Sequence, residues 1–294
     1  MADETGEALS GYWEDDQTDL DCVSPDEREQ IETDLLLEGI YRAYGFDFRH
    51  YLRSSLRRRI HYRMNEEGLQ TITELLNKVL HEPLFIDRLI NDFSIKVTEM
   101  YRDPSFFLAF RRDVVPLLKQ QPEIRIWHAG CATGEEAYSM AILLLEEDLL
   151  SKSKIYATDM NQLVIDEAKL GKFPLKRMQS FTKNYLKAGG TKEFSSYYHT
   201  DNKHAYFHDS IKQNMMFAQH NLATDVSFNE FHVILCRNVL IYFDSDLQCR
   251  VHNLFFDSLS SYAFLCLGSM ESLISVHRPE YHDFNATERI FRKK

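Results

Sequence analysis

The sequence of 294 residues lacks any apolar run close to the roughly 20 residues that a membrane-spanning helix requires. Its N-terminus also lacks the basic region followed by an apolar one that marks a signal peptide. No CxxC pair is present, and the five cysteines, at positions 22, 131, 236, 249 and 266, are odd in number and scattered, which argues against a zinc site or a redox couple. We therefore expect free thiols and a soluble cytoplasmic protein without membrane insertion.

Basic residues are nearly missing from the first 34 positions, where 13 acidic residues face only Arg28. This stretch has a net charge of −12, which leaves about +1 for the rest of a chain whose total is −11. Residues 1–24 contain few aliphatic side chains, so they are predicted to form a disordered acidic leader. The nearly neutral remainder gives bulk nucleic-acid binding no electrostatic support.

Residues 25–93 carry the signals of short helices. Ser24 is expected to cap the first helix, with Pro25 at its first position and Glu27 completing a capping box. Helical patterns cover residues 31–44, 51–65, 71–81 and 83–93. They predict a small all-α N-terminal domain, followed by a linker and a helix over residues 94–122.

Strands and helices alternate through residues 123–294. This alternation predicts an α/β domain with a doubly wound, mainly parallel sheet. Residues 172–214 are too long for a crossover connection, where a few residues are usual. Their tyrosines and phenylalanines, together with Gly189-Gly190, predict an inserted antiparallel β-subdomain.

The stretch 124–138 reads I-R-I-W-H-A-G-C-A-T-G-E-E-A-Y and is the most informative part of the chain. An apolar strand leads into a loop with Gly130 and Gly134, and a helix opens on Glu135 and Glu136, which is the order of a cofactor-binding motif. A dinucleotide would place its pyrophosphate at the helix N-terminus, where two carboxylates would repel it. A cationic ligand without phosphate, such as S-adenosylmethionine (SAM), fits better. The simpler alternative is that the two acids only favour the helix dipole.

Polar residues also follow three later predicted strands. In a parallel sheet, the carboxyl ends of these strands lie along the same edge. Asp159 stands where doubly wound nucleotide-binding folds place an acid for the ribose hydroxyls, although it could also cap the next helix. Asn221 could meet an adenine edge while Leu222 packs on the ring. Arg237 could pair with the carboxylate of a cofactor, or form a surface salt bridge.

Seven sequence blocks occur in a fixed order along residues 26–294. They are R-R-R-I at 57–60, V-T-E-M-Y-R-D-P-S-F-F at 97–107, A-G-C-A-T-G-E-E-A-Y at 129–138, A-T-D-M at 157–160, N-L at 221–222, C-R-N-V-L-I-Y-F-D at 236–244, and G-S-M-E-S-L at 268–273 before a basic C-terminal strand. Together these blocks resemble the CheR family of chemotaxis-receptor glutamate methyltransferases. The resemblance implies a class I SAM-dependent methyltransferase fold, and the acidic leader lies outside it.

The resemblance also implies roles for individual residues. The implied SAM contacts, carried over position by position, are Thr98, Arg102, Glu135 or Glu136, Asp159, Asn221, Leu222, Arg237 and Asn238. Arg102 and Tyr242 are implied to lie close to the transferred methyl group, and S-adenosylhomocysteine (SAH) is the implied product. The chain departs from the family at Lys96, where some members have Asn, and at Met100-Tyr101, which replaces a Phe-Phe pair.

The implied acceptor is a glutamate side chain on the cytoplasmic helices of a chemoreceptor. Since the unperturbed pKa of glutamate is about 4.3, the acceptor is already a carboxylate at neutral pH and needs no general base. The enzyme has to hold a carboxylate oxygen in line with the S–CH3 bond at near-attack distance. This requirement explains why the sequence shows no Ser-His-Asp or Cys-His arrangement.

Six arginines and no acidic residue fall between positions 49 and 63. Helical spacing would place Leu52, Leu56, Ile60 and Met64 on the inward side. Because like charges this close repel one another, the arginine face is predicted to bind an acidic helical substrate. The predicted substrate-binding residues are Arg53, Arg57, Arg58, Arg59 and Arg63. The alternatives are a solvated face, or pairing with the acidic leader.

Two other functions remain open. A SAM-binding signalling module without methyl transfer is one, and the presence of Arg102 and Tyr242 argues against it. A nucleotide-dependent oxidoreductase is the other, and the acids after Gly134 disfavour it. No metal is expected, because the histidines at 199, 204 and 208 match no strong zinc spacing. The protein is expected to be a monomer.

Overall fold

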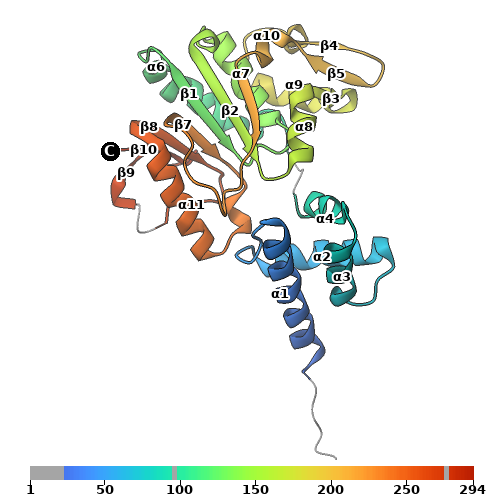
Figure 1. Cartoon of the computed structure of the whole chain (residues 1–294). Helices are drawn as coiled ribbons and strands as arrows, with labels where there is room; N and C mark the ends of the chain where they lie inside the picture. Colours follow the sequence, from blue (N-terminus) through green and yellow to red (C-terminus); the bar gives the residue numbers. More distant parts are fainter. Residues whose placement is uncertain (1–22, 95–97, 275–277) are drawn as a thin grey trace, which may run out of the picture.

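The computed structural model describes residues 23–94, 98–274 and 278–294. Four helices form the N-terminal part: α1 (Pro25–Tyr44), α2 (Arg53–Glu67), α3 (Ile72–His81) and α4 (Phe85–Phe93). They lie together beneath the edge of a large β-sheet (Figure 1). In the described ranges, no helix is long and apolar enough to cross a bilayer.

The first helix begins as its sequence indicates. The hydroxyl of Ser24 accepts a hydrogen bond from the backbone N–H of Glu27, and the carboxylate of Glu27 accepts one from the backbone N–H of Ser24. The predicted inward side of α2 is confirmed for Leu56, Ile60 and Met64, which are buried against α1, α3 and α4. The prediction is wrong for Leu52, which precedes the helix and is exposed. These helices therefore enclose a hydrophobic core of their own.

A connecting segment joins this core to the sheet. Pro104 opens α5 (Pro104–Ala109), which continues through a π-helical turn (Phe110–Val114) into α6 (Val115–Leu118). The sequence pattern predicted one helix here. The extra residue in the π turn accompanies Pro116, which cannot donate a backbone hydrogen bond inside a helix.

In the described part of the chain, seven strands form the main sheet, in the order β6-β2-β1-β7-β8-β10-β9. The parallel strands are β1 (Ile124–Ala129), β2 (Ser153–Asp159), β6 (Met215–Gln219), β7 (Phe231–Cys236) and β8 (Leu259–Leu267). The last two strands, β9 (Tyr281–Asn285) and β10 (Ile290–Lys293), pair antiparallel with their neighbours. The mainly parallel sheet is confirmed, whereas β9 was not among the predicted strands.

Each face of the sheet contributes to a separate core. Ile124 and Ile126 pack on one face with α7 (Glu135–Glu146), α8 (Gln162–Leu170) and the connecting helices. Trp127 and Ala129 face the other side, toward α11 (Ser245–Ser258). The alternation of side chains along β1 thus places helices on both faces, as expected for a doubly wound fold.

The insertion at 172–214 contains the predicted antiparallel sheet. Its strands are β3 (Lys172–Pro174), β4 (Tyr198–Thr200) and β5 (His204–Phe207), in the order β3-β5-β4. It also contains two helices that the sequence pattern did not predict, α9 (Met178–Lys187) and α10 (Asp209–Lys212). The subdomain lies beside α8 at the far end of the sheet from β9 (Figure 1).

Candidate active site

A cavity opens where the carboxyl ends of β1, β2 and β7 meet the helical domain. The sheet contributes Gly130, Asp159 and Arg237, and the connecting segment contributes Thr98 and Arg102. Further lining residues come from α2 and from the turn before it, and they are Tyr51, Ser55, Leu56 and Arg59. Two parts of the chain that are remote in sequence therefore enclose one site.

The glycine loop after β1 packs closely against the loop after β7 and the end of β2. Gly130 has φ 79°, and a Cβ atom there would lie 2.6 Å from Cγ2 of Val239. Gly134, with φ 91°, precedes the first residue of α7. The backbone N–H of Ala132, between the two glycines, donates to a carboxylate oxygen of Asp159 at 3.0 Å. The loop and the end of β2 are thus held together.

Asp159 lies on the cavity wall, at the position predicted for a ribose ligand. Its other carboxylate oxygen accepts a hydrogen bond from the backbone N–H of Asn161 at 3.0 Å. The cap of α8 is Asn161, whose side chain accepts from Leu163 N at 2.9 Å. The alternative that Asp159 itself caps this helix is therefore wrong. A carboxylate offers about four acceptor positions, so it can also receive hydroxyl donors.

The two acids at the start of α7 have different environments. Glu135 is fully buried outside the cavity lining, 2.7 Å from Nη1 of Arg177, and burial raises its pKa more than Thr133 and Arg177 lower it. Glu136 lines the cavity. Burial raises the pKa of Glu136, but its contacts with His128, at 3.0 Å, and Arg237, at 2.9 Å, outweigh that effect and lower it. The geometry favours Glu136 as the ligand for a cation.

Arg237 departs from the role suggested by its position. Its guanidinium group pairs with Glu136 at 2.9 Å and with Asp103 at 2.8 Å, and it stacks 4.1 Å from the ring centre of Phe106. It also donates to the backbone carbonyl of Arg102 at 3.3 Å. Two carboxylates already compensate its charge, so in this structure Arg237 positions Glu136 and the connecting segment. Its predicted contact with a cofactor carboxylate stays a prediction.

Arg102 occupies a strained part of the backbone. Its neighbours Tyr101 and Asp103 have φ angles of 52° and 55°, which non-glycine residues seldom adopt. Tyr101 is held in place because its ring is buried and its backbone N–H donates to Ser139 Oγ at 2.9 Å. Strain of this kind persists where the surroundings impose it, and here it fixes Arg102 at the cavity.

The loop after β7 carries Asn238 and Tyr242 into the cavity lining. Asn238 has φ 62°, and its backbone N–H donates to the carboxylate of Glu271 at 3.0 Å. The guanidinium carbon of Arg59, on α2, lies 6.0 Å from the centre of the Tyr242 ring. Both residues predicted to lie near the methyl group, Arg102 and Tyr242, therefore share one cavity with Arg59.

Asn221 and Leu222 also line the cavity. The side-chain oxygen of Asn221 accepts from the backbone N–H of Ala223 at 3.0 Å, which forms a tight turn after β6. Leu222 is almost fully buried. An adenine contact by either residue stays a prediction, and the turn alone accounts for the choice of asparagine.

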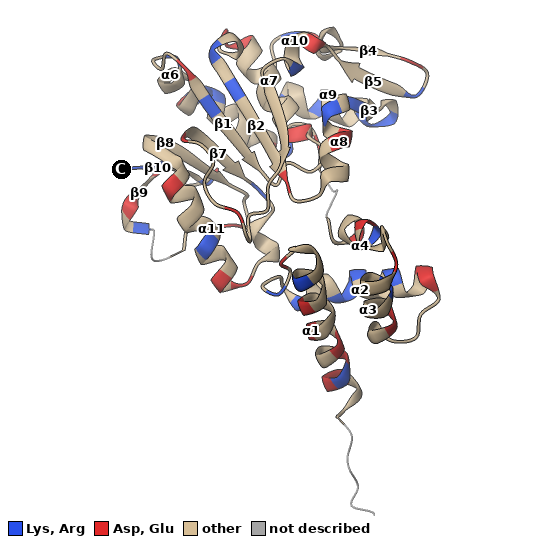
Figure 2. Ribbon diagram, viewed as in Figure 1, with Lys and Arg blue, Asp and Glu red and all other residues tan. Residues whose placement is uncertain are grey.

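Most of the arginines of α2 already have partners. Figure 2 shows basic residues along α2 and acidic residues along the neighbouring α1. The ion pairs are Arg53 with Asp34 at 2.5 Å, Arg57 with Glu29 at 2.6 Å, and Arg63 with Asp92 at 2.6 Å. Three of these arginines therefore pair with acids of the helical domain, and their binding of an acidic substrate stays a prediction. Arg58 is exposed and Arg59 lines the cavity. Residues 1–22 of the predicted acidic leader lie outside the described residues.

Comparisons with known proteins agree with this geometry. Residues 96–290 match the family model described as CheR methyltransferase, SAM binding domain, and residues 31–94 match the CheR methyltransferase all-alpha domain. The chain belongs to the CheR methyltransferase family. It therefore has the class I SAM-dependent methyltransferase fold, and SAM is its cofactor.

The proteins found in the comparisons differ in their similarity to this chain. Cher3 of Pseudomonas putida, a methyltransferase by name, is 44% identical over 272 residues, which is 92% of this chain and 100% of that protein. The chemotaxis protein methyltransferase of Borreliella burgdorferi is 28% identical and covers 85% of this chain and 91% of its own. A SAM-dependent methyltransferase of Geobacter sulfurreducens, solved with SAH, is 13% identical with a TM-score of 0.32, and the match covers 58% of this chain and 50% of that one.

The residues present fit the family's cofactor. Beside the glycine loop, Asp159 and Glu136 line the cavity and offer acceptors for the ribose hydroxyls and the ammonium group of SAM. The described residues contain no group of three or more His, Cys, Asp and Glu side chains that could hold a metal ion.

Several contributing residues were not found from the sequence. His128, Glu271, Arg177 and Tyr51 each hold or line the site. His128 and Glu271 lie beside or inside the sequence blocks that resemble the family, so these blocks could have indicated that both residues lie near the site. The sequence did not indicate their hydrogen-bond partners, because these depend on how remote segments fold together.

Proposed function

We propose that this protein transfers the methyl group of SAM to glutamate side chains on the cytoplasmic helices of a chemoreceptor, giving glutamate methyl esters and SAH. The observation that carries the proposal is the distribution of charge around one cavity. Carboxylates of Asp159 and Glu136 and the guanidinium groups of Arg59 and Arg102 line the same space. A cationic donor and an anionic acceptor can therefore both find partners there.

The bound cofactor supplies an electrophilic methyl group on a sulfonium sulfur. Asp159 accepts hydrogen bonds from the ribose hydroxyls, and Glu136 accepts them from the ammonium group. Arg59, Arg102 and the hydroxyl group of Tyr242 orient the acceptor carboxylate, and the ring of Tyr242 closes the space beside it. Burial lowers the pKa of Arg59, with a further effect from Arg58, yet arginine stays charged at neutral pH. Holding two partly desolvated reactants in line is the main contribution to the rate.

Receptor recognition is proposed to use Arg58 and Arg59, because Arg53, Arg57 and Arg63 are engaged by acids of the helical domain. An exposed cation at position 58 can meet acidic residues on a receptor helix, while Arg59 meets the glutamate that is methylated. We also propose that the protein acts in the cytoplasm, where those helices lie, and as a monomer.

The test is a transfer assay with labelled SAM and receptor cytoplasmic fragments. Label should be released as methanol by mild alkali, which is characteristic of a carboxylate ester. Tyr242→Phe should lower kcat while the Kd for SAH, measured by calorimetry, stays near the wild-type value. Arg102→Lys should also lower kcat, because a single ammonium group cannot hold a carboxylate as a guanidinium group does. Arg112→Lys, at an exposed site paired with Asp113, is its matched control. Tight SAH binding without any transfer to receptor fragments would instead support a SAM-binding signalling module.

A further inference from the structure

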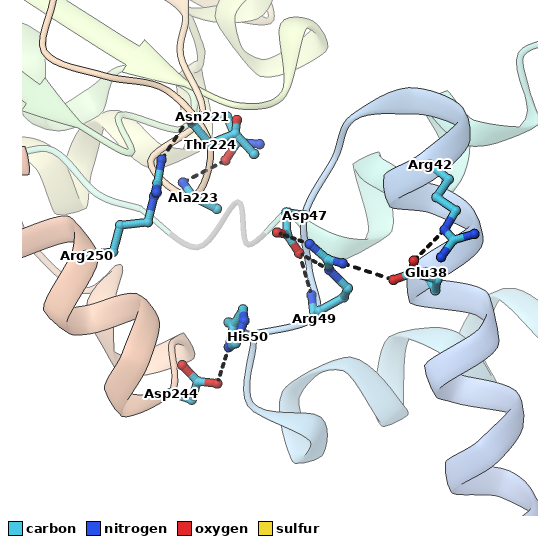
Figure 3. A network of polar contacts seen from close by, with 10 residues as sticks. All are labelled: Glu38, Arg42, Asp47, Arg49, His50, Asn221, Ala223, Thr224, Asp244 and Arg250. Atoms are coloured by element: carbon cyan, nitrogen blue, oxygen red, sulfur yellow. Dashed lines mark hydrogen bonds and ion pairs between the residues drawn. The ribbon is translucent and has the colours of Figure 1, made fainter.

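The helical domain is joined to the SAM domain by a short antiparallel contact. The backbone N–H of Leu52 donates to the carbonyl of Tyr242 at 2.8 Å, and the N–H of Asp244 donates to the carbonyl of His50 at 2.9 Å. Between these bonds, Tyr51 forms a β-bridge with Phe243. His50 Nδ1 also lies 2.9 Å from the carboxylate of Asp244, as Figure 3 shows. We call this contact between residues 50–52 and 242–244 the seam. It fixes the backbone of Tyr51 beside the loop after β7, which carries Asn238 and Tyr242.

The ring of Tyr51 is held as firmly as its backbone. It packs edge to face against Phe243, with ring centres 4.8 Å apart, and against Phe48 at 5.0 Å. Such pairs fix ring orientation and add stability beyond the buried area. Tyr51 lines the same cavity as Asp159 and Met160, which end β2. A side chain of the helical domain thus reaches the part of the wall assigned to the ribose.

The hydroxyl group of Tyr51 has a poor partner in this structure. It donates to the thioether sulfur of Met160 at 3.5 Å, and sulfur is a weak acceptor. Burial raises the pKa of Tyr51, with a further contribution from the charge of Asp159, so the phenol remains a neutral donor at physiological pH. A buried donor with a weak acceptor gains when a stronger acceptor enters the cavity.

We infer that Tyr51 donates a hydrogen bond to the nucleoside half of SAM, so that tight cofactor binding requires the helical domain to be docked. The inference rests on the SAM-dependent activity proposed above and adds a residue from the other domain to the cofactor site. Ribose oxygens and adenine ring nitrogens are both stronger acceptors than a thioether. The β-bridge at Phe243 then links cofactor binding to the position of Tyr242.

Calorimetric titration with two ligands tests the inference. SAH contains the whole spent cofactor, and 5′-methylthioadenosine shares its nucleoside but lacks the amino-acid group. Tyr51→Phe removes one neutral hydrogen bond and should raise the Kd of both ligands by the same factor, about 3- to 10-fold. Tyr62→Phe, on the exposed surface of α2, is the matched control and should leave both Kd values unchanged.

The possible outcomes are distinct. Wild-type protein that binds neither ligand would refute the proposed function itself. Wild-type binding with an equal Kd in Tyr51→Phe would overturn only the inference. Weaker binding of SAH without weaker binding of 5′-methylthioadenosine would move the contact to the amino-acid half and contradict the assignment to the nucleoside.

Hydrogen exchange separates a cofactor contact from a merely structural role. SAH should slow exchange of the amide hydrogens of Leu52 and Asp244 in the wild type, because both donate across the seam. This protection should be smaller in Tyr51→Phe at equal saturation. A variant with a lowered melting temperature but wild-type Kd and wild-type protection would show that the hydroxyl only stabilises the fold.

Discussion

Substitution of Glu271 tests how the loop after β7 is held in place. Its buried carboxylate accepts four backbone hydrogen bonds. Gly268 and Asn238 donate to Oε2 at 2.6 and 3.0 Å, and Val239 and Leu240 donate to Oε1 at 2.8 Å each. One side chain therefore ties the loop after β7 to the loop after β8. We predict that Glu271→Gln loosens this connection although the side chain keeps its size.

The expected loss in the free energy of unfolding follows from the hydrogen-bonding groups of an amide. The carbonyl oxygen of glutamine can serve two of the four N–H groups, whereas its NH2 group faces the other two as a second donor. Two charge-assisted hydrogen bonds are lost, at about 1.5–3 kcal/mol each, so the free energy of unfolding should fall by about 3–6 kcal/mol. The Kd for SAH should rise as well, because Asn238 lies on the released loop and lines the cavity.

Denaturant unfolding followed by circular dichroism measures the first effect, and calorimetry with SAH measures the second. Glu280→Gln removes the same charge from an exposed position and is expected to change neither quantity. A loss smaller than about 1 kcal/mol in Glu271→Gln would refute the reasoning, because it would mean that the four N–H groups do not depend on this carboxylate.

Four further predictions concern single substitutions. Arg59→Ala should reduce kcat/KM for receptor fragments at least about tenfold, as for a hydrogen-bonded charge. Arg63→Ala should cost about 2–3 kcal/mol in urea unfolding, because it leaves the mostly buried carboxylate of Asp92 without its ion-pair partner. Gly130→Ala should weaken SAH binding in calorimetry and lower stability by at least about 1 kcal/mol, because its Cβ would meet Val239 at 2.6 Å. Glu136 has a lowered pKa when folded, so the stability it provides is present above its ordinary value of 4.5 and lost as the pH falls through the lower folded value. Unfolding measured between pH 3 and pH 7 should be less pH-dependent in Glu136→Gln.

The local features of this fold could be predicted from the sequence. The cap at Ser24 and the strand at 215–219 were both correct, because each depends on residues close together in the chain. The edge of the parallel sheet was equally predictable. Asp159 ends β2, Arg237 directly follows β7 and Asn221 lies two residues beyond β6. In a parallel sheet such residues lie along the same edge.

Partners remote in sequence could not be predicted in this way. Arg237 and Asp103 are 134 positions apart, and Arg63 and Asp92 are 29 apart. Helical spacing indicated which side of α2 carries the arginines, but not that α1 and α4 would bring acids against that side. The ion pairs of Arg53, Arg57 and Arg63 could not be foreseen for this reason, whereas Arg59 is distinguished by its place at the cavity.

The arrangement of charges has a consequence for the two domains. The acids assigned to the cofactor lie on the sheet and on α7, whereas Arg59 lies on α2 of the helical domain. An acceptor glutamate can therefore meet a complete set of partners only when the helical domain is docked through the 50–52 and 242–244 contact. Because Tyr242 supplies the carbonyl for one of those hydrogen bonds, docking also sets the backbone of a residue proposed to lie next to the methyl group. Separating the domains should then reduce methyl transfer more than it reduces SAH binding.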